Sequence, residues 1–145
     1  MNCNSADPSA TVPQLTGTRY PMKQRILVVD DDRMVADTLN LIFKANGYES
    51  EAAYSAAEGL ARARTFDPGL LLCDITMPEE TGLQLAETFQ REMPNCKLLM
   101  LTAYSSNAIK VEQHATRMKR PLRMLNKPCR PEVLLRAAHD LLQTA

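Results

Sequence analysis

Short, largely apolar runs recur along the chain, and each ends in polar or turn-forming residues. The clearest of them cover 26–29, 70–73, 97–101 and 122–125. Such runs, which lack polar alternation, are typical of strands buried on both faces of a parallel sheet. A weaker run over 48–53 predicts a further strand, at the edge of the sheet.

Between these runs the apolar positions change to helical spacing. Asn46-Gly47 predicts a left-handed helix end, and Ser55 with Glu58 three residues later has the spacing of a capping box. We expect helices over about 34–45, 55–65, 82–93 and 107–118, and a last one from Pro131. The expected apolar positions are Met34, Val35, Thr38, Leu39, Leu41, Ile42 and Ala45 in the first helix, and a buried stripe of Val133, Leu134, Ala137, Ala138, Leu141 and Leu142 in the last.

Five strands that alternate with five helices predict an α/β fold. The sheet would be parallel and doubly wound, with helices on both faces, and five strands favour the flavodoxin-like order 2-1-3-4-5. Residues 1–24 are rich in Pro, Ser and Thr and poor in large apolar residues, so we expect a disordered tail before a single domain over 25–145. Docking of this tail through Leu15, Tyr20 and Met22 is the alternative.

Composition narrows the classes of function. The formal net charge is zero, which argues against a nucleic-acid or membrane-surface partner. The four cysteines have no metal-ligand spacing, and they are typical of free thiols in a reducing compartment. There is no apolar run of the roughly 18 residues that a membrane helix needs, nor a hydrophobic signal segment, so we expect a cytoplasmic protein.

Candidate chemistry lies directly after the predicted strands. Asp30 and Asp31 follow the first strand, Asp74 the third, Thr102 the fourth and Lys127 the fifth. In the predicted order these strands are neighbours, so their carboxyl ends place all five side chains at one crevice.

Clustered carboxylates repel one another by about 4 kcal/mol per pair at 4 Å and an effective dielectric constant near 20, so they favour a bound cation. An all-oxygen ligand set suits Mg²⁺, with Mn²⁺ as a substitute, and Mg²⁺ in turn suggests a phosphoryl substrate. We expect Asp74 to be the nucleophile, Asp30 and Asp31 to hold the metal, and Thr102 and Lys127 to stabilise the phosphoryl oxygens.

The chain resembles the receiver domain of bacterial two-component response regulators, of the stand-alone type. The motifs are Val28-Val29-Asp30-Asp31-Asp32, Asp74-Ile75-Thr76-Met77-Pro78 with Gly82, Leu101-Thr102-Ala103 and Lys127-Pro128. The resemblance implies a phosphorelay switch rather than an enzyme. Asp74 would take a phosphoryl group from a histidine kinase or a phosphotransfer protein. Mg²⁺ would lie on Asp31, Asp74 and the Thr76 main-chain carbonyl, with Asp30 helping through water.

The chain also departs from the family pattern. Met124 stands where receivers usually carry an aromatic switch residue, while Thr76 and Tyr104 occupy positions that tune the lifetime of the phosphoryl group. A basic cluster could form a surface for a downstream partner or be a solvated helix end; its residues are Arg117, Lys119, Arg120 and Arg123. Asp32 is expected at the periphery of the metal site.

Two other functions remain open. The first is a receiver that binds partners without being phosphorylated. The second is a haloacid-dehalogenase-like phosphohydrolase, suggested by Asp30-x-Asp32, although Glu132 and Asp140 are the only acids after Lys127 and both fall in the last helix. Homodimerisation and the completeness of the chain are also left open.

Overall fold

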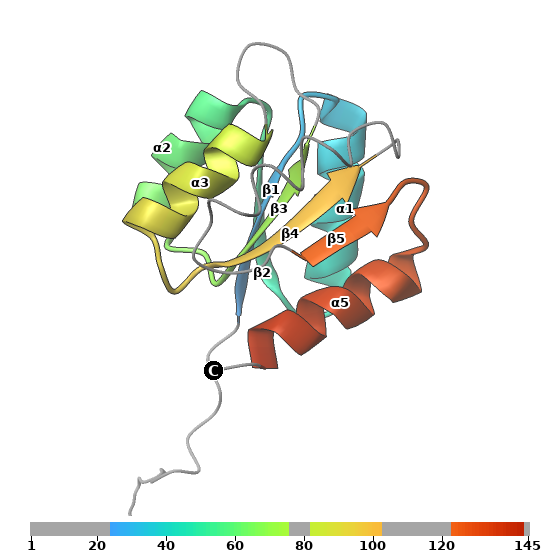
Figure 1. The fold of residues 1–145 in the computed structure, drawn as a ribbon. Helices are drawn as coiled ribbons and strands as arrows, with labels where there is room; N and C mark the ends of the chain where they lie inside the picture. The colour runs from blue at the N-terminus through green and yellow to red at the C-terminus, as the bar shows by residue number, and fades with distance from the viewer. Residues whose placement is uncertain (1–23, 76–81, 103–122, 144–145) are drawn as a thin grey trace, which may run out of the picture.

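The sheet has the predicted architecture. The computed structural model describes residues 24–75, 82–102 and 123–143, and in it five parallel strands have the order β2-β1-β3-β4-β5 (Figure 1). The flavodoxin-like prediction is therefore confirmed. The strands are β1 (Arg25–Val29), β2 (Glu49–Ala53), β3 (Leu70–Asp74), β4 (Lys97–Thr102) and β5 (Arg123–Asn126), and the helices are α1 (Arg33–Ala45), α2 (Ala56–Phe66), α3 (Gly82–Glu92) and α5 (Pro131–Gln143). The tail and the predicted helix over 107–118 lie outside the described residues.

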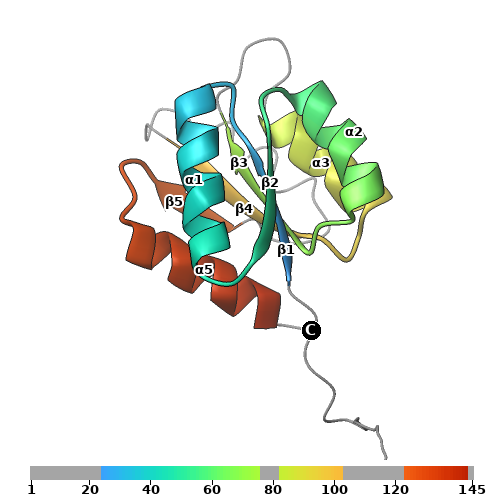
Figure 2. The ribbon, with the colours of Figure 1, turned by 180° about the vertical axis from the view of Figure 1, so that it is seen from behind.

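Two apolar layers enclose the sheet, with α2 and α3 on one face and α1 and α5 on the other (Figures 1 and 2). The central strand β3 is buried along its whole length. Its side chains alternate, so that Leu71 and Cys73 join one layer while Leu70 and Leu72 join the other. Cys73 is thus a core residue, as predicted, and within the described residues no helix is long and apolar enough to cross a membrane.

Local signals at the helix ends agree with the sequence. Gly47 has a φ of 91°, in the left-handed region that ends α1. The Ser55 hydroxyl accepts a hydrogen bond from the Glu58 backbone N–H, and Glu58 in turn accepts one from the Tyr54 N–H. In a standard capping box the glutamate would accept from the N–H of the N-cap residue, Ser55; here it accepts from the residue before it.

The expected buried stripe of α5 was partly wrong, and several of the apolar positions of α1 are exposed. Met34 and Leu41 of α1 are 78% and 66% exposed, and Val133 of α5 is 47% exposed. In α1 it is Ala36 and Phe43 that face the sheet. The apolar arc of this helix is wider than the face that the sheet can cover, so spacing alone did not identify which side is buried.

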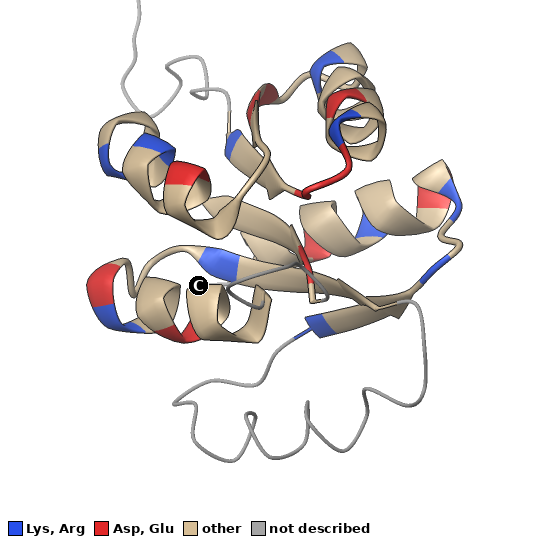
Figure 3. Cartoon of the chain, turned by 90° about the horizontal axis from the view of Figure 1, so that it is seen from above, with Lys and Arg blue, Asp and Glu red and all other residues tan. Residues whose placement is uncertain are grey.

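The register of the ladders aligns the carboxyl ends of the strands. Val29 pairs with Cys73, Asp74 with Leu101, and Thr102 with Asn126. The residues that follow these positions therefore meet at one edge of the sheet. Figure 3 views the molecule from this side, with basic and acidic residues interspersed over the helices.

Candidate functional site

Three carboxylates meet at the carboxyl edge of the sheet. Asp30 directly follows β1 and is 2% exposed, Asp74 is the last residue of β3 and is 8% exposed, and Asp31 is exposed. One oxygen of each lies within 4.8 Å of those of the other two. The structure thus brings together the three acids that the strand ends were expected to gather.

Lys127 supplies the cation of this cluster. Its Nζ donates a hydrogen bond to Asp74 Oδ2 at 3.0 Å and lies 3.7 Å from Asp30 Oδ2. The Lys127 main chain is fixed as well, because its N–H donates to the Thr102 carbonyl at 2.7 Å. One ammonium therefore connects the ends of β1, β3 and β5.

Thr102 lies beside this cluster as the last residue of β4, and it is buried. The backbone around it is tied to both neighbouring strands. The N–H of Ile75 donates to the Leu101 carbonyl at 2.9 Å, on the β3 side, and Lys127 donates to Thr102 on the β5 side. These bonds hold the Thr102 main chain one residue beyond the register partner of Asp74.

Asp30 is held by backbone groups from two directions. Its N–H donates to the Ala53 carbonyl at 3.1 Å, and its Oδ1 accepts from the Asp32 N–H at 2.9 Å. The Asp32 side chain accepts from Met34 and Val35 N–H groups as the N-cap of α1. Asp32 thus contacts Asp30 through its backbone N–H, while its side chain caps α1. Its expected place at the metal-site periphery stays a prediction.

The electrostatics of the cluster follow from burial. Desolvation is the main cause that raises the pKa of Asp30, and the nearby charges of Asp74 and Asp31 add to the increase. For Lys127, burial acts to lower the pKa, but the hydrogen bond and charge of Asp74, together with the charge of Asp30, outweigh it and raise the pKa. Two buried carboxylates face one ammonium, and the exposed Asp31 lies beside them, so the cluster has an excess of negative charge.

The donor set fits a hard divalent cation. All the side-chain donors of the cluster are carboxylate oxygens, which Mg²⁺ prefers. Asp30 Oδ2 is buried and has no hydrogen-bond partner among the described residues. Lys127 Nζ, at 3.7 Å, is an ion-pair partner beyond ordinary hydrogen-bond distance. A buried acceptor without a hydrogen bond costs free energy, so this oxygen keeps the capacity to accept one from a water or a ligand.

Gly82, the first residue of α3, lies directly against the main chain of Asp74. A Cβ at this position would lie 2.1 Å from the Asp74 carbonyl oxygen and 3.0 Å from Cys73 Sγ. The Gly82 N–H donates to the Ile75 carbonyl at 2.9 Å. Only glycine allows α3 to begin this close to the main chain of the central carboxylate.

The other predicted residues are only partly placed. Met124 is half-buried in β5, pairs with Met100 and packs against the layer of α2 and α3, and Arg123 is exposed. Thr76, Tyr104 and the remaining members of the basic cluster, Arg117, Lys119 and Arg120, lie outside the described residues. Three cysteines that the structure describes are free thiols, as expected.

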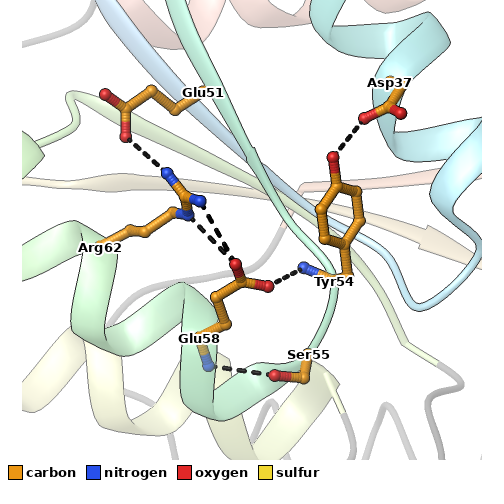
Figure 4. Close-up of polar contacts among 6 residues, drawn as sticks. All are labelled: Asp37, Glu51, Tyr54, Ser55, Glu58 and Arg62. Atoms are coloured by element: carbon orange, nitrogen blue, oxygen red, sulfur yellow. Dashed lines mark hydrogen bonds and ion pairs between the residues drawn. The ribbon is translucent and has the colours of Figure 1, made fainter.

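Tyr54 connects the start of α1 to the β2–α2 connection, and sequence reasoning missed it. Its hydroxyl donates to Asp37 Oδ1 at 2.5 Å (Figure 4). Its ring lies 4.1 Å from the Arg33 guanidinium carbon, a cation–π contact. Because both partners lie in α1, about 20 residues before Tyr54 in the sequence, only the Glu58 capping signal pointed to this region.

Comparison of the sequence with known proteins identifies its family. The sequence matches the family described as response regulator receiver domain over residues 26–139. It is 36% identical over 85 residues to the response regulator MprA of Mycobacterium bovis, which covers 59% of this chain and 37% of that protein. The chain thus spans little more than a third of the length of this relative.

Solved structures agree with this match. A CheY-like response regulator receiver domain protein from Methanospirillum hungatei has a TM-score of 0.73 and 31% identity, covering 83% of this chain and 94% of that one. The chemotaxis response regulator CheY4 of Vibrio cholerae has a TM-score of 0.73 and 26% identity, covering 83% and 99%. With the fold and the strand-end residues described above, these matches show that the chain belongs to the response regulator receiver domain family of two-component signalling.

Proposed function

We propose that this receiver accepts a phosphoryl group on Asp74 and transmits the signal by changing its affinity for a partner. The contact between Lys127 Nζ and Asp74 Oδ2 is the observation that supports this proposal most strongly. It orients the carboxylate at the end of the central strand and supplies a positive charge beside the reacting oxygen. The donor would be a histidine kinase or a phosphotransfer protein.

In the proposed reaction, an Asp74 carboxylate oxygen attacks the phosphorus of a phosphohistidine. The P–N bond breaks, the imidazole nitrogen leaves with its electron pair, and an acyl phosphate forms on Asp74. The Lys127 ammonium neutralises charge on one phosphoryl oxygen, and the Thr102 hydroxyl donates to another. Asp74 keeps its orientation because Gly82 and Ile75 fix the backbone on both sides of β3's end.

Asp31 and Asp74 would hold Mg²⁺ directly, together with the Thr76 carbonyl, and Asp30 would contact it through water; Mn²⁺ is a chemically similar substitute. When bound, the ion supplies positive charge that offsets the three carboxylates and the incoming phosphoryl group. Asp30 Oδ2, which has an ion pair with Lys127 but no hydrogen bond among the described residues, supports a role for this residue in the metal site.

The proposed output is a change in the surface around Thr102 and β5. Met124 would take the role of the usual aromatic switch by changing rotamer, since a thioether side chain is flexible and fills irregular gaps. Its half-buried position at the edge strand leaves room for such a change. A partner would then bind near Arg117, Lys119, Arg120 and Arg123.

The test is phosphorylation by acetyl phosphate with Mg²⁺, followed on a phosphate-affinity gel. Wild type should show a shifted band that needs the metal, Asp74→Asn should show none, and Lys127→Met should form it about 100-fold more slowly. Glu132→Gln, on the exposed start of α5, is the matched control and should behave as wild type. A folded wild type without a shifted band would support instead the receiver that binds partners without phosphorylation, which Met124 favours.

A further inference from the structure

Strand β2 forms one edge of the sheet, and in the described part of the chain no element lies beyond it (Figure 2). The Glu49 N–H donates to the Gln24 carbonyl, and the Ala53 carbonyl accepts from Asp30. Residues at these odd positions therefore pair with β1. Since strand groups alternate with a period of two, the backbone N–H and C=O of Ser50 and Ala52 point away from the sheet.

Two hollows follow this open edge. Their volumes are about 430 and 460 Å³, and both are lined by Glu49, Glu51 and Phe66. Ser50 lines the second hollow, is 4% exposed, and its hydroxyl has no hydrogen-bond partner among the described residues. Ser50 and Ala52 are 4% and 8% exposed, so only a small part of their outward backbone groups reaches the surface. The edge therefore offers these backbone groups, a buried hydroxyl and, on the other face, the Phe66 ring.

The charge on one side of this strip is negative. Glu49 and Glu51 point to the same face of the sheet because they are two residues apart. Arg62 lies 3.6 Å from Glu51 and 3.3 Å from Glu58, so one guanidinium serves two carboxylates (Figure 4). Arg25 and Asp67, which pair with each other at 3.5 Å, line the first hollow, and Lys44 lines the second. The four carboxylates Glu49, Glu51, Glu58 and Asp67 therefore exceed the three cations Arg25, Lys44 and Arg62, and Glu49 has no ion pair among the described residues.

We propose that the β2 edge binds an extended, basic segment of a partner protein as an added strand. Its backbone would pair with Ser50 and Ala52, and lysine or arginine side chains at alternate positions would lie opposite Glu49 and Glu51. A serine or threonine on the other face would meet the Ser50 hydroxyl. This surface lies on the opposite side of β1 from Asp74, so the proposal goes beyond the phosphorylation chemistry and does not depend on it.

A second copy of the chain fits this edge less well. Antiparallel pairing of two β2 strands centred on Glu51 would place that carboxylate directly opposite its counterpart. Pairing centred on Ser50 would place Glu49 opposite Glu51 of the second copy. Like charges directly across a ladder destabilise it, so these two registers disfavour a second copy and the excess of carboxylates favours a basic partner.

The test uses ¹⁵N-labelled full-length protein and three capped hexapeptides, in which threonine alternates with lysine, glutamate or glutamine. The lysine peptide should shift the amide resonances of Ser50 and Ala52 and slow their hydrogen exchange, because these N–H groups become hydrogen-bonded. The glutamate peptide should do neither, and the glutamine peptide should bind more weakly. Resonance shifts without exchange protection would show charge attraction alone and would overturn strand addition.

Charge reversal at Glu49 tests the assigned face. Glu49→Lys should weaken binding of the lysine peptide at least about two- to fivefold and strengthen binding of the glutamate peptide. Glu132→Lys on α5 is the control and should change neither affinity, because Glu132 is exposed like Glu49 but does not lie at the β2 edge. Equal effects of the two variants would overturn the site. Concentration-dependent shifts of Ser50 and Ala52 without any peptide would identify a second copy as the occupant and would also overturn the proposal.

Discussion

Two clusters in this domain gather carboxylates around a single cation, and they differ mainly in burial. At the strand ends, the side chains of Asp30, Asp74 and Lys127 are 3%, 11% and 29% exposed. On α2, Arg62 is 43% exposed between Glu51 and Glu58. The first cluster has a carboxyl group, Asp30, with a raised pKa and an oxygen that has no hydrogen bond among the described residues, while the ion pairs of the second cluster are in contact with water.

The difference shows where charge can do chemistry. Exposed ion pairs are screened and contribute about 0–1 kcal/mol each, so the Arg62 cluster contributes little beyond local order in α2. Buried charges lose hydration and keep strong mutual interactions, so the excess negative charge at the strand ends would be stabilised by further positive charge. A divalent cation bound there would supply this charge.

The largest expected effect comes from a substitution at Gly82, where α3 packs against the Asp74 main chain. Gly82→Ala places a Cβ against the Asp74 carbonyl, a backbone atom that cannot rotate away, and it should lower the free energy of unfolding by about 2–4 kcal/mol. Urea denaturation measures the loss. Gly69→Ala is the matched control, because its Cβ would meet the end of the Leu142 side chain at 3.2 Å, and it should cost less than about 1 kcal/mol. Equal losses in both variants would show that the contact at Asp74 is not special.

The next effect removes a buried charge. Burial raises the pKa of Asp30 above its ordinary value of 3.8, so the folded state binds this proton more tightly than the unfolded state does. Charged Asp30 therefore destabilises the fold at neutral pH, and Asp30→Asn should raise the free energy of unfolding by about 1–3 kcal/mol at pH 7 without divalent cations.

This gain should shrink as the pH falls through the raised pKa of folded Asp30, and it should vanish only below the ordinary pKa, where wild-type Asp30 is protonated in both states. Urea denaturation between pH 4 and 8 follows it. Glu51→Gln, in the exposed cluster, should change stability by less than about 0.5 kcal/mol over the same range. A less stable Asp30→Asn protein at pH 7 would contradict the account of the buried cluster.

The smallest effect lies in the exposed cluster itself. Arg62→Gln should lower the free energy of unfolding by no more than about 0.5 kcal/mol at 0.03 M NaCl. At 0.5 M NaCl the screening length is roughly fourfold shorter, so most of that difference should disappear. Thermal unfolding at the two salt concentrations measures it. A salt-independent loss above 1 kcal/mol would mean that the two clusters differ less than their burial indicates.

The sequence predicted the elements whose signals are local. Unbroken apolar runs located the strands, and because parallel strands end at one edge, the convergence of Asp30, Asp74 and Lys127 followed from the strand order alone. The faces of α1 and α5 did not follow, since exposed Met34, Leu41 and Val133 belong to apolar arcs wider than the contact surface. The cap formed by Asp32 was missed because three consecutive aspartates offer the same chemistry. The side-chain partners of Tyr54 lie in α1, remote from it in the sequence, and leave no local spacing to detect.

The central claim is that Asp74, and not a neighbouring acid, carries the phosphoryl group. Borohydride reduction of the protein after acetyl phosphate treatment converts an aspartyl phosphate to homoserine, which peptide mass mapping locates. The account predicts homoserine at position 74, dependent on Mg²⁺ during phosphorylation. Homoserine at position 30 or 31, or none in a folded protein treated with acetyl phosphate and Mg²⁺, would contradict it.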